Sequence, residues 1–322
     1  MGKDTASEHE RRLDWVSQTV GHDASSLVAS PRQLGYRARV RLSADGKGGL
    51  GFHPPRSHEV LTVQDCPVAR PKLVHAMAEL PSVPAGVSHV ELRTDGEKVV
   101  AVFEVKRGAH GPIRSWANAL PEDALGGADL AVDGKAVRGD CKVQITANDV
   151  SHRLSPGTFY QVNLEINDQL VRHVNEAVRA RQPAHVLDAF AGAGNLSMPL
   201  AQAGLQVTQI ESHPSAVRDA RATAKRLGLT IDARVQRGQD FEAGQVFFDL
   251  AIIDPPRSGA GAMMQQILTT RPKALIMVSC NPHTLTRDVR QAKDAGYSLS
   301  ELHVYEMFPQ TEHAEVLAVL DR

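Results

Sequence analysis

Two patterns of hydrophobic and polar positions divide the chain near residue 150. Before it, short β-prone runs such as "YRARVRLS" and "KVVAVFEV" are separated by Gly, Pro and Asp, which predicts a mostly β module. After it, apolar runs alternate with helical segments, which is typical of an α/β layer on a parallel sheet. We therefore expect an N-terminal helical extension over 1–33, a mostly β central domain over 34–150 and an α/β domain over 151–322.

The α/β part contains seven candidate strands. They are "HVLDAF", "QVTQIE", "ARVQ", "VFFDLAIID", "KALIMVSC", "SLSELHVYEM" and "AEVLAVL". Helices are expected between them at about 163–181, 195–203, 213–227, 261–270 and 283–295. No helix fits between the last two strands, so these should pair antiparallel and give a mostly parallel sheet with one reversed strand. In such sheets ligands bind at the carboxyl ends of the strands.

Composition narrows the class of protein. The chain has 322 residues, 42% hydrophobic and 23% charged, and no apolar run approaches the roughly 20 residues that span a bilayer. We expect no membrane contact, and the charged N-terminus favours a cytoplasmic protein over a secreted one. Three widely spaced cysteines predict neither a disulfide framework nor a metal site.

The net charge of −1 excludes a globally basic nucleic-acid binder but not a local basic patch. Arg37, Arg39 and Arg41 alternate in "YRARVRL", so on a strand they share one face. That face would either grip phosphates or simply be solvated. We expect a monomer.

A glycine turn follows the first strand of the α/β part in "VLDAFAGAGNLSM". Gly192 and Gly194 permit close approach of the backbone to a ligand, as in nucleotide-binding turns, although the third glycine of the dinucleotide pattern is missing. Glu211 ends the next strand, where a carboxylate accepts ribose hydroxyls. Asp240, after the third strand, would reach an adenine amino group or be an ordinary loop aspartate.

Two further strand ends carry reactive groups. Asp254 precedes two prolines in "AIIDPPR", which turn the backbone rigidly out of the sheet. Arg257 stands where enzymes that methylate exocyclic amines usually have an aromatic residue. Cys280 in "VSCNP" precedes a capping Asn281, and the helix N-terminus there favours thiolate over thiol. Its position indicates a nucleophile rather than a buried core cysteine.

The last strand begins in "FPQTEHAEVLAVL", which brings His313 and Glu315 to the same edge. Alone, this segment would be a turn with solvated charges. No second histidine lies at ligand spacing, so His313 is not expected to bind a metal.

Together these motifs resemble the RNA uridine-5 methyltransferase family, which makes 5-methyluridine in tRNA and ribosomal RNA. The resemblance rests on "FYQVN" (159–163), "DAFAGAGN", "IIDPPRSGA", "VSCNPHTLTRD" and "MFPQTEHAE", in family order and spacing. It implies a Rossmann-like class I methyltransferase domain that uses S-adenosylmethionine and acts on RNA.

The resemblance also implies roles for individual residues. Cys280 would be the nucleophile and Glu315 the base. The residues that would contact S-adenosylmethionine are Gln161, Phe190, Gly192, Asn195, Glu211, Asp240 and Asp254. Many members of the family carry an N-terminal RNA-binding β-barrel, for which about 33 residues are too few. Some hold a four-cysteine iron-sulfur cluster, of which only Cys66 is matched, so we expect no cluster.

The implied chemistry starts at carbon 6 of the uracil ring. Thiolate addition there makes carbon 5 nucleophilic enough to take a methyl group, and a base must then remove the carbon 5 proton, which suits an ionised Glu315. The target base must leave its stack, which favours single-stranded or bulged RNA.

Three alternatives remain open at this point. An RNA cytosine-5 methyltransferase typically has a cysteine where this chain has Arg257. A nicotinamide-dependent oxidoreductase would use the same glycine turn but leave "SCNP" and "HAE" unexplained. A catalytically silent RNA-binding module would not need Cys280 and Glu315.

Overall fold

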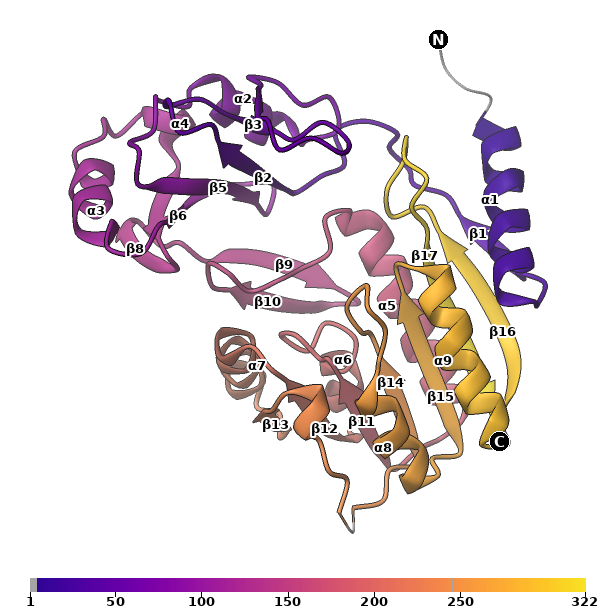
Figure 1. Cartoon of the computed structure of the whole chain (residues 1–322). Coiled ribbons are helices and arrows are strands. Elements are labelled where there is room, and N and C mark those ends of the chain that lie inside the picture. Colours follow the sequence, from indigo (N-terminus) through magenta and orange to yellow (C-terminus); the bar gives the residue numbers. More distant parts are fainter. Residues whose placement is uncertain (1–4, 245) are drawn as a thin grey trace.

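The computed structural model describes residues 5–244 and 246–322. It contains two large β-sheets and a two-stranded hairpin that lies between them (Figure 1). The eight-stranded, methyltransferase-like sheet contains the strands after residue 180 and lies beside the C-terminus. The seven-stranded central sheet contains strands between residues 39 and 138 and forms the other part of the molecule. None of the helices in the described part of the chain is long and apolar enough to cross a membrane.

The larger sheet contains all seven strands that the sequence predicts after residue 150. They are β11 (His185–Ala189), β12 (Gln206–Glu211), β13 (Asp232–Val235), β14 (Leu250–Ile253), β15 (Ala274–Ser279), β16 (Ser298–Tyr305) and β17 (Glu315–Asp321). The strand order is β1-β16-β17-β15-β14-β11-β12-β13. Strand β17 runs antiparallel to both β15 and β16, which confirms the single reversed strand.

An eighth strand comes from the N-terminal extension, which the sequence analysis treated as helical. The amphipathic helix α1 (Thr5–Val20) forms, but the chain then adds β1 (Ser26–Val28) parallel to β16 at the edge of the sheet. A buried Glu306 fixes this segment, because it accepts a hydrogen bond from the Ser30 amide at 2.9 Å and pairs with Arg12 at 3.3 Å. The three residues of β1 do not alternate between buried and exposed positions, so the sequence pattern did not predict this strand.

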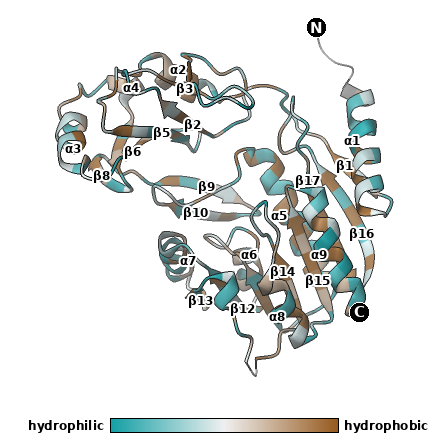
Figure 2. Cartoon of the chain, viewed as in Figure 1, coloured by the Kyte–Doolittle hydropathy of each residue, from teal (hydrophilic) through white to brown (hydrophobic). Residues whose placement is uncertain are grey.

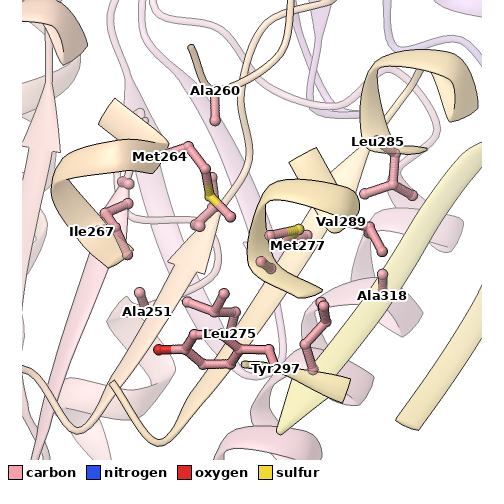
Figure 3. Close-up of a cluster of buried hydrophobic side chains, with 14 of the residues drawn as sticks. Ala251, Ala260, Met264, Ile267, Leu275, Met277, Leu285, Val289, Tyr297 and Ala318 are labelled. Atoms are coloured by element: carbon pink, nitrogen blue, oxygen red, sulfur yellow. The ribbon is translucent and has the colours of Figure 1, made fainter. Parts of the chain in front are cut away.

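Helices cover both faces of this sheet, as the alternation of its side chains requires. Helices α8 (Ala262–Thr270) and α9 (Pro282–Asp294) pack on one face with α1. Figure 3 shows this core, in which Met264 and Val289 lie over Leu275 and Met277 of β15. The other face is covered by α5 (Leu164–Ala180) and α6 (Met198–Gln202), next to α7 (Pro214–Leu227).

Polarity follows the same division. In Figure 2 helices α7 and α9 are largely teal on the outside, whereas the strands between the helix layers are brown. The five helices of this part lie where the sequence predicted them, although α6 starts three residues later than expected.

The central sheet has the order β4-β3-β2-β5-β6-β7-β8. Its strands are β2 (Arg39–Ala44), β3 (Leu50–Phe52), β4 (Leu61–Thr62), β5 (Val87–Thr94), β6 (Val99–Val105), β7 (Asp129–Val132) and β8 (Lys135–Arg138), and its helices are α2 (Pro71–Ala78), α3 (His110–Asn118) and α4 (Ala124–Gly127). Two of these strands, β2 and β6, lie in the runs "YRARVRLS" and "KVVAVFEV" from which the sequence predicted a mostly β module. Val40 and Leu42 are buried while Arg41 is exposed, which confirms the alternation in "YRARVRL".

The hairpin of β9 (Val143–Ala147) and β10 (Val150–Leu154) connects the two sheets. It packs under the central sheet and against α5 and α7 (Figure 1). The division expected at residue 150 would run through this hairpin, and that boundary stays a prediction.

The loop after the hairpin carries "FYQVN" and is held from the central sheet. The fully buried Arg93 donates to the Ser155 carbonyl at 2.8 Å and the Thr158 carbonyl at 2.6 Å. Its guanidinium also lies 4.9 Å from the centre of the Tyr160 ring. Gln161 therefore reaches the methyltransferase-like sheet from a loop that both parts of the molecule hold in place.

Candidate active site

A pocket opens where β11 and β14 end. Its volume is about 60 Å³, which is smaller than the roughly 300–1,000 Å³ of sites that enclose a whole small molecule and corresponds to part of one. Five of the residues expected to contact the cofactor line it, namely Gln161, Phe190, Gly192, Asn195 and Asp254. The structure thus brings these five together from the "FYQVN" loop, the glycine turn and the "DPPR" turn.

The glycine turn has the backbone conformation that close approach to a ligand requires. Gly194 has a φ of +85°, and a Cβ there would meet the Gln209 amide nitrogen at 2.5 Å. Phe190 has a φ of +63°, which is unusual for a bulky residue and indicates a conformation imposed by the surrounding structure. The turn is therefore specified by packing, and its strain lies at the pocket wall.

Glu211 supports the same turn from the end of β12. The Gly192 amide donates to its Oε2 at 3.0 Å, and the His213 amide donates to its Oε1 at 2.6 Å. Glu211 thereby adjoins the pocket without lining it. Asp240 does neither, because it is exposed and its Oδ2 accepts from Arg237 Nε at 2.6 Å. It is the last residue of a short 3₁₀ helix, Gly238–Asp240, in which Gly238 lies next to the Phe190 ring.

Strand register places Cys280, Glu315 and Asp254 at one edge of the sheet. Ser279 of β15 is paired with Val316 of β17, so Cys280 and Glu315 occupy the next pair of positions in the antiparallel register. Opposite residues in such pairs have Cα atoms about 4.5–5.5 Å apart. Ile253 of β14 is paired with Met277, which brings Asp254 to the same level on the other side of β15. The sequence predicted this meeting from strand ends alone.

The local structure around Cys280 also agrees with the sequence. Asn281 caps α9, because its Oδ1 accepts from the His283 amide at 3.1 Å, and Pro282 is the first helical residue. The shift of the Cys280 pKa, however, has the opposite direction from the one expected from the sequence. Burial raises the pKa of Cys280, Glu315 and Asp254 raise it further, and only Arg257 opposes them, through its charge and a hydrogen bond to the sulfur. The thiolate expected from the helix N-terminus is thus disfavoured in the ligand-free protein.

The carboxyl groups of the site behave in the same way. Burial raises the pKa of Asp254 to about 7. Burial and the neighbouring Asp254 raise the pKa of Glu315 well above its ordinary value, against the opposing charge of Arg257. The ionised Glu315 expected from the sequence stays a prediction, and the direction of this pKa works against it. Two acids and a thiol lie around one cation, Arg257, and this excess of acidic groups favours a positively charged ligand.

Asp188 is a third buried acid, which the sequence analysis did not single out. Burial raises its pKa to about 7, although the Ser197 hydroxyl donates a hydrogen bond to it. The Gln209 amide nitrogen donates to the same hydroxyl at 2.9 Å. This small network lies directly beneath the glycine turn and fixes its first residues.

Two other contributions to the site were missed from the sequence. Arg257 was noted only as evidence against amine methylation, yet it is the cation beside Cys280 and Glu315. Its place directly after the proline pair was the available signal. The hairpin residues Ile145, His152 and Leu154 line the pocket, and nothing in their local sequence indicated this.

The remaining predicted groups lie around the rim. His313 is exposed, stacks edge-on against Phe308 and has a pKa lowered by burial and by the charges of Arg257 and Arg37. Among the described residues, no group of three His, Cys, Asp or Glu side chains could hold a metal ion.

The eight-stranded sheet with one reversed strand and a nucleotide-type turn defines a Rossmann-like methyltransferase. The family model "tRNA (Uracil-5-)-methyltransferase" matches residues 129–322, and the chain belongs to this family. Membership confirms the enzyme class expected from the sequence, an RNA (uracil-5-)-methyltransferase that uses S-adenosylmethionine.

Individual relatives are consistent with this assignment. The 23S rRNA (uracil(1939)-C(5))-methyltransferase RlmD of Shewanella sediminis is 29% identical over 100% of this chain and 77% of its own length. The enzyme of the same name from Aromatoleum aromaticum is 31% identical over 89% of this chain and 73% of its own length. The fold resembles that of Pyrococcus abyssi tRNA (uracil-54, C5)-methyltransferase, solved with S-adenosyl-L-homocysteine, with a TM-score of 0.78 and 24% identity over 98% of this chain and 83% of that one.

Proposed function

We propose that this protein methylates carbon 5 of a uridine in 23S rRNA through a covalent bond between Cys280 and carbon 6 of the base. The register that brings Cys280, Glu315 and Asp254 to one edge of the sheet is the observation that carries the proposal. The choice of 23S rRNA over tRNA follows the names of the relatives from Shewanella sediminis and Aromatoleum aromaticum. We place the reaction in the cytoplasm, where that RNA is found.

The residues fit the proposed cofactor. The pocket is lined by residues from three strand ends, the glycine turn permits close approach, and Glu211 adjoins the turn where ribose hydroxyls would lie. S-adenosylmethionine supplies a methyl group on a positively charged sulfur, and this charge favours the ionised forms of Asp254, Glu315 and Cys280. Binding of the cofactor would therefore lower the pKa values of these three groups before the reaction begins.

Cys280 and Glu315 have complementary roles in the proposed reaction. The Cys280 sulfur adds to carbon 6, which makes carbon 5 electron-rich, and Arg257 stabilises the thiolate before the addition. After carbon 5 carries the methyl group, Glu315 accepts its proton, and the electron pair released expels the Cys280 sulfur. A base with a raised pKa is a better proton acceptor, so burial of Glu315 suits this step once it is ionised.

The RNA would approach along a groove between β2 and the loop at 309–311. Arg37, Arg39 and Arg41 line this groove with Phe52. Arg39 is paired with Glu91 at 3.4 Å, and Arg41 with Glu104. Among the described residues, no carboxylate lies within ion-pair distance of Arg37, whose Nε is buried without a hydrogen-bond partner. Arg37 is thus the arginine of the three that is open to a phosphate.

Phe159 marks the passage from this groove to the cofactor pocket. Its ring is 57% exposed, lines the pocket and lies 4.7 Å from the Arg39 guanidinium. Exposed aromatic rings stack on unpaired bases of any sequence. We therefore assign to Phe159 a contact with the flipped target base or its neighbour.

The test uses S-adenosylmethionine with a 23S rRNA transcript and a tRNA pool as separate substrates. We expect 5-methyluridine in the 23S rRNA, no product with Cys280→Ala, and a protein–RNA adduct on denaturing gels with Glu315→Gln. Cys141→Ala, in the core beside the central sheet, is the matched control and should retain activity. Activity of Cys280→Ala would refute the mechanism, 5-methylcytidine would refute the base, and methylation of tRNA alone would reassign the substrate.

A further inference from the structure

One wall of the cofactor pocket comes from outside the methyltransferase-like sheet. The hairpin β9–β10 contributes Ile145, His152 and Leu154. Ile145 and His152 are paired directly across the two strands, so their side chains lie on the same face. The same hairpin packs with Ala193 of the glycine turn in one hydrophobic cluster. The hairpin therefore closes the pocket over the turn.

His152 is the polar residue of this otherwise apolar wall. It is 3% exposed, and neither Nδ1 nor Nε2 has a hydrogen-bond partner. A buried polar atom without a partner costs about 1–3 kcal/mol. The ring lies close to the backbone of Ala193, but it makes no well-formed hydrogen bond there. A histidine that only filled space would be replaced by an apolar ring at no cost.

The imidazole is held in its neutral form. Burial lowers the pKa of His152 to about 4, with a further contribution from the charge of Arg226. A neutral imidazole offers one N–H donor and one nitrogen acceptor. It can therefore donate to a carboxylate or accept from an ammonium group without adding a charge to the pocket.

The position of His152 in the pocket indicates which part of the cofactor it would contact. The pocket is bounded by Gln161, Asn195 and Asp254, whereas Glu211 and Asp240, expected at the ribose and adenine, do not line it. The pocket thus corresponds to the end opposite the nucleoside. An α-amino-acid group carries both an ammonium donor and a carboxylate acceptor, which match the two ring nitrogens.

We propose that His152 is a cofactor-binding residue that hydrogen-bonds the α-amino-acid end of S-adenosylmethionine through its neutral imidazole. The proposal rests on the proposed cofactor site but not on the RNA chemistry. It assigns to the hairpin a role in ligand recognition, in addition to joining the two sheets.

Two ligands that differ only in the amino-acid end provide the test. S-adenosylhomocysteine carries that end and 5′-methylthioadenosine lacks it, and calorimetry measures the Kd of each without RNA. We expect His152→Phe to weaken S-adenosylhomocysteine about tenfold, or about 1.4 kcal/mol, and methylthioadenosine less than twofold. His152→Gln keeps a donor and an acceptor and should recover most of the loss.

His89→Phe makes the same replacement on β5 of the central sheet, outside the pocket lining, and should change neither Kd. Equal weakening of both ligands in His152→Phe would show a purely structural role, and an unchanged Kd for S-adenosylhomocysteine would also overturn the proposal. If His152→Phe does not fold, His152→Gln and His152→Ala replace it. The ratio of the Kd of S-adenosylhomocysteine to the Kd of methylthioadenosine should then be higher for His152→Ala than for His152→Gln, and equal ratios would overturn the proposal. Wild-type protein that binds neither ligand would refute the cofactor site itself, which is a different outcome.

Discussion

The carboxyl edge of the large sheet and the arginine face of the central sheet treat charge in opposite ways. At the edge, Asp188 and Glu315 are buried and Asp254 is half-buried, and removal from water raises the pKa of each. On the central sheet, Arg41 and Glu104 form a bidentate pair near the surface, which lowers the pKa of Glu104. In the first region the acidic groups outnumber the cations, and the second region mostly balances its own charges.

This difference in charge balance indicates which kind of ligand each region can bind. Unbalanced buried acids cost folding free energy, and a positively charged cofactor recovers that cost on binding. Balanced surface pairs contribute little to stability and leave little charge for a partner. Arg37, which precedes β2 and forms only isolated bridges, is the exception, because it lies over the Phe308 ring at 5.7 Å and has no carboxylate partner among the described residues.

The largest expected effect concerns the pH dependence of stability. An unfolded Asp titrates near 3.9, whereas the pKa of Asp188 in the folded protein is about 7. Between these values the folded state binds more protons, so the free energy of unfolding falls as pH rises from about 4 to about 7. At about 1.4 kcal/mol per pKa unit, Asp188 alone accounts for a loss of about 4 kcal/mol.

Urea unfolding at a series of pH values, with Asp188→Asn beside the wild type, measures this effect. The variant should lose much of the decline, because the amide does not titrate. Asp45→Asn, at an exposed turn aspartate whose pKa is lowered by backbone hydrogen bonds, should keep it. Parallel curves for Asp188→Asn and wild type would contradict the assignment of an unbalanced acid at this position.

A smaller effect is expected for RNA binding. Arg37→Ala should weaken the 23S rRNA fragment about tenfold and reduce the slope of log affinity against log salt by about 1, because one phosphate contact is lost. Arg41→Ala should change both less, since Glu104 already neutralises that guanidinium. Filter binding at several salt concentrations makes the comparison. Equal losses for the two variants would show that pairing on the central sheet does not decide which arginine meets RNA.

The smallest effect is expected at Asp240. Because its carboxylate is exposed and paired with Arg237, Asp240→Asn should weaken S-adenosylhomocysteine less than threefold. Glu211→Gln should weaken the same ligand at least tenfold, since Glu211 adjoins the glycine turn. Calorimetry of both variants measures the difference. A large loss with Asp240→Asn would mean that its loop moves onto the cofactor.

The regular part of the fold followed from the sequence because strand and helix periods are local. All seven strands after residue 150 and the reversed β17 could be predicted, and with them the meeting of Cys280 and Glu315. The pKa directions of those two groups could not. They depend on burial and on Asp254 and Arg257, which lie on other strand ends, and a helix N-terminus alone gave the wrong sign for Cys280.

Two other features depend on contacts between distant segments. The strand β1 is too short to show a pattern and is defined by pairing with β16. His152 looks like any alternating strand residue, and only the packing of the hairpin over Ala193 turns it toward the pocket. The adenine contact expected of Asp240 stays a prediction, since its carboxylate lies outside the pocket lining and pairs with Arg237.

The pairing of β1 with β16 also bears on the order of folding. It joins Ser26 to His303, so the central sheet and every other strand of the methyltransferase-like sheet except β17 lie between the two strands along the chain. Such a contact of high sequence separation forms late, because the ends of a long loop must first be brought together. During synthesis, β1 can pair with β16 only after residues 303–305 have been made. The proposed nucleophile Cys280 follows β15 and the proposed base Glu315 begins β17, so the proposed site is complete only after the segment around residue 315 has been synthesised.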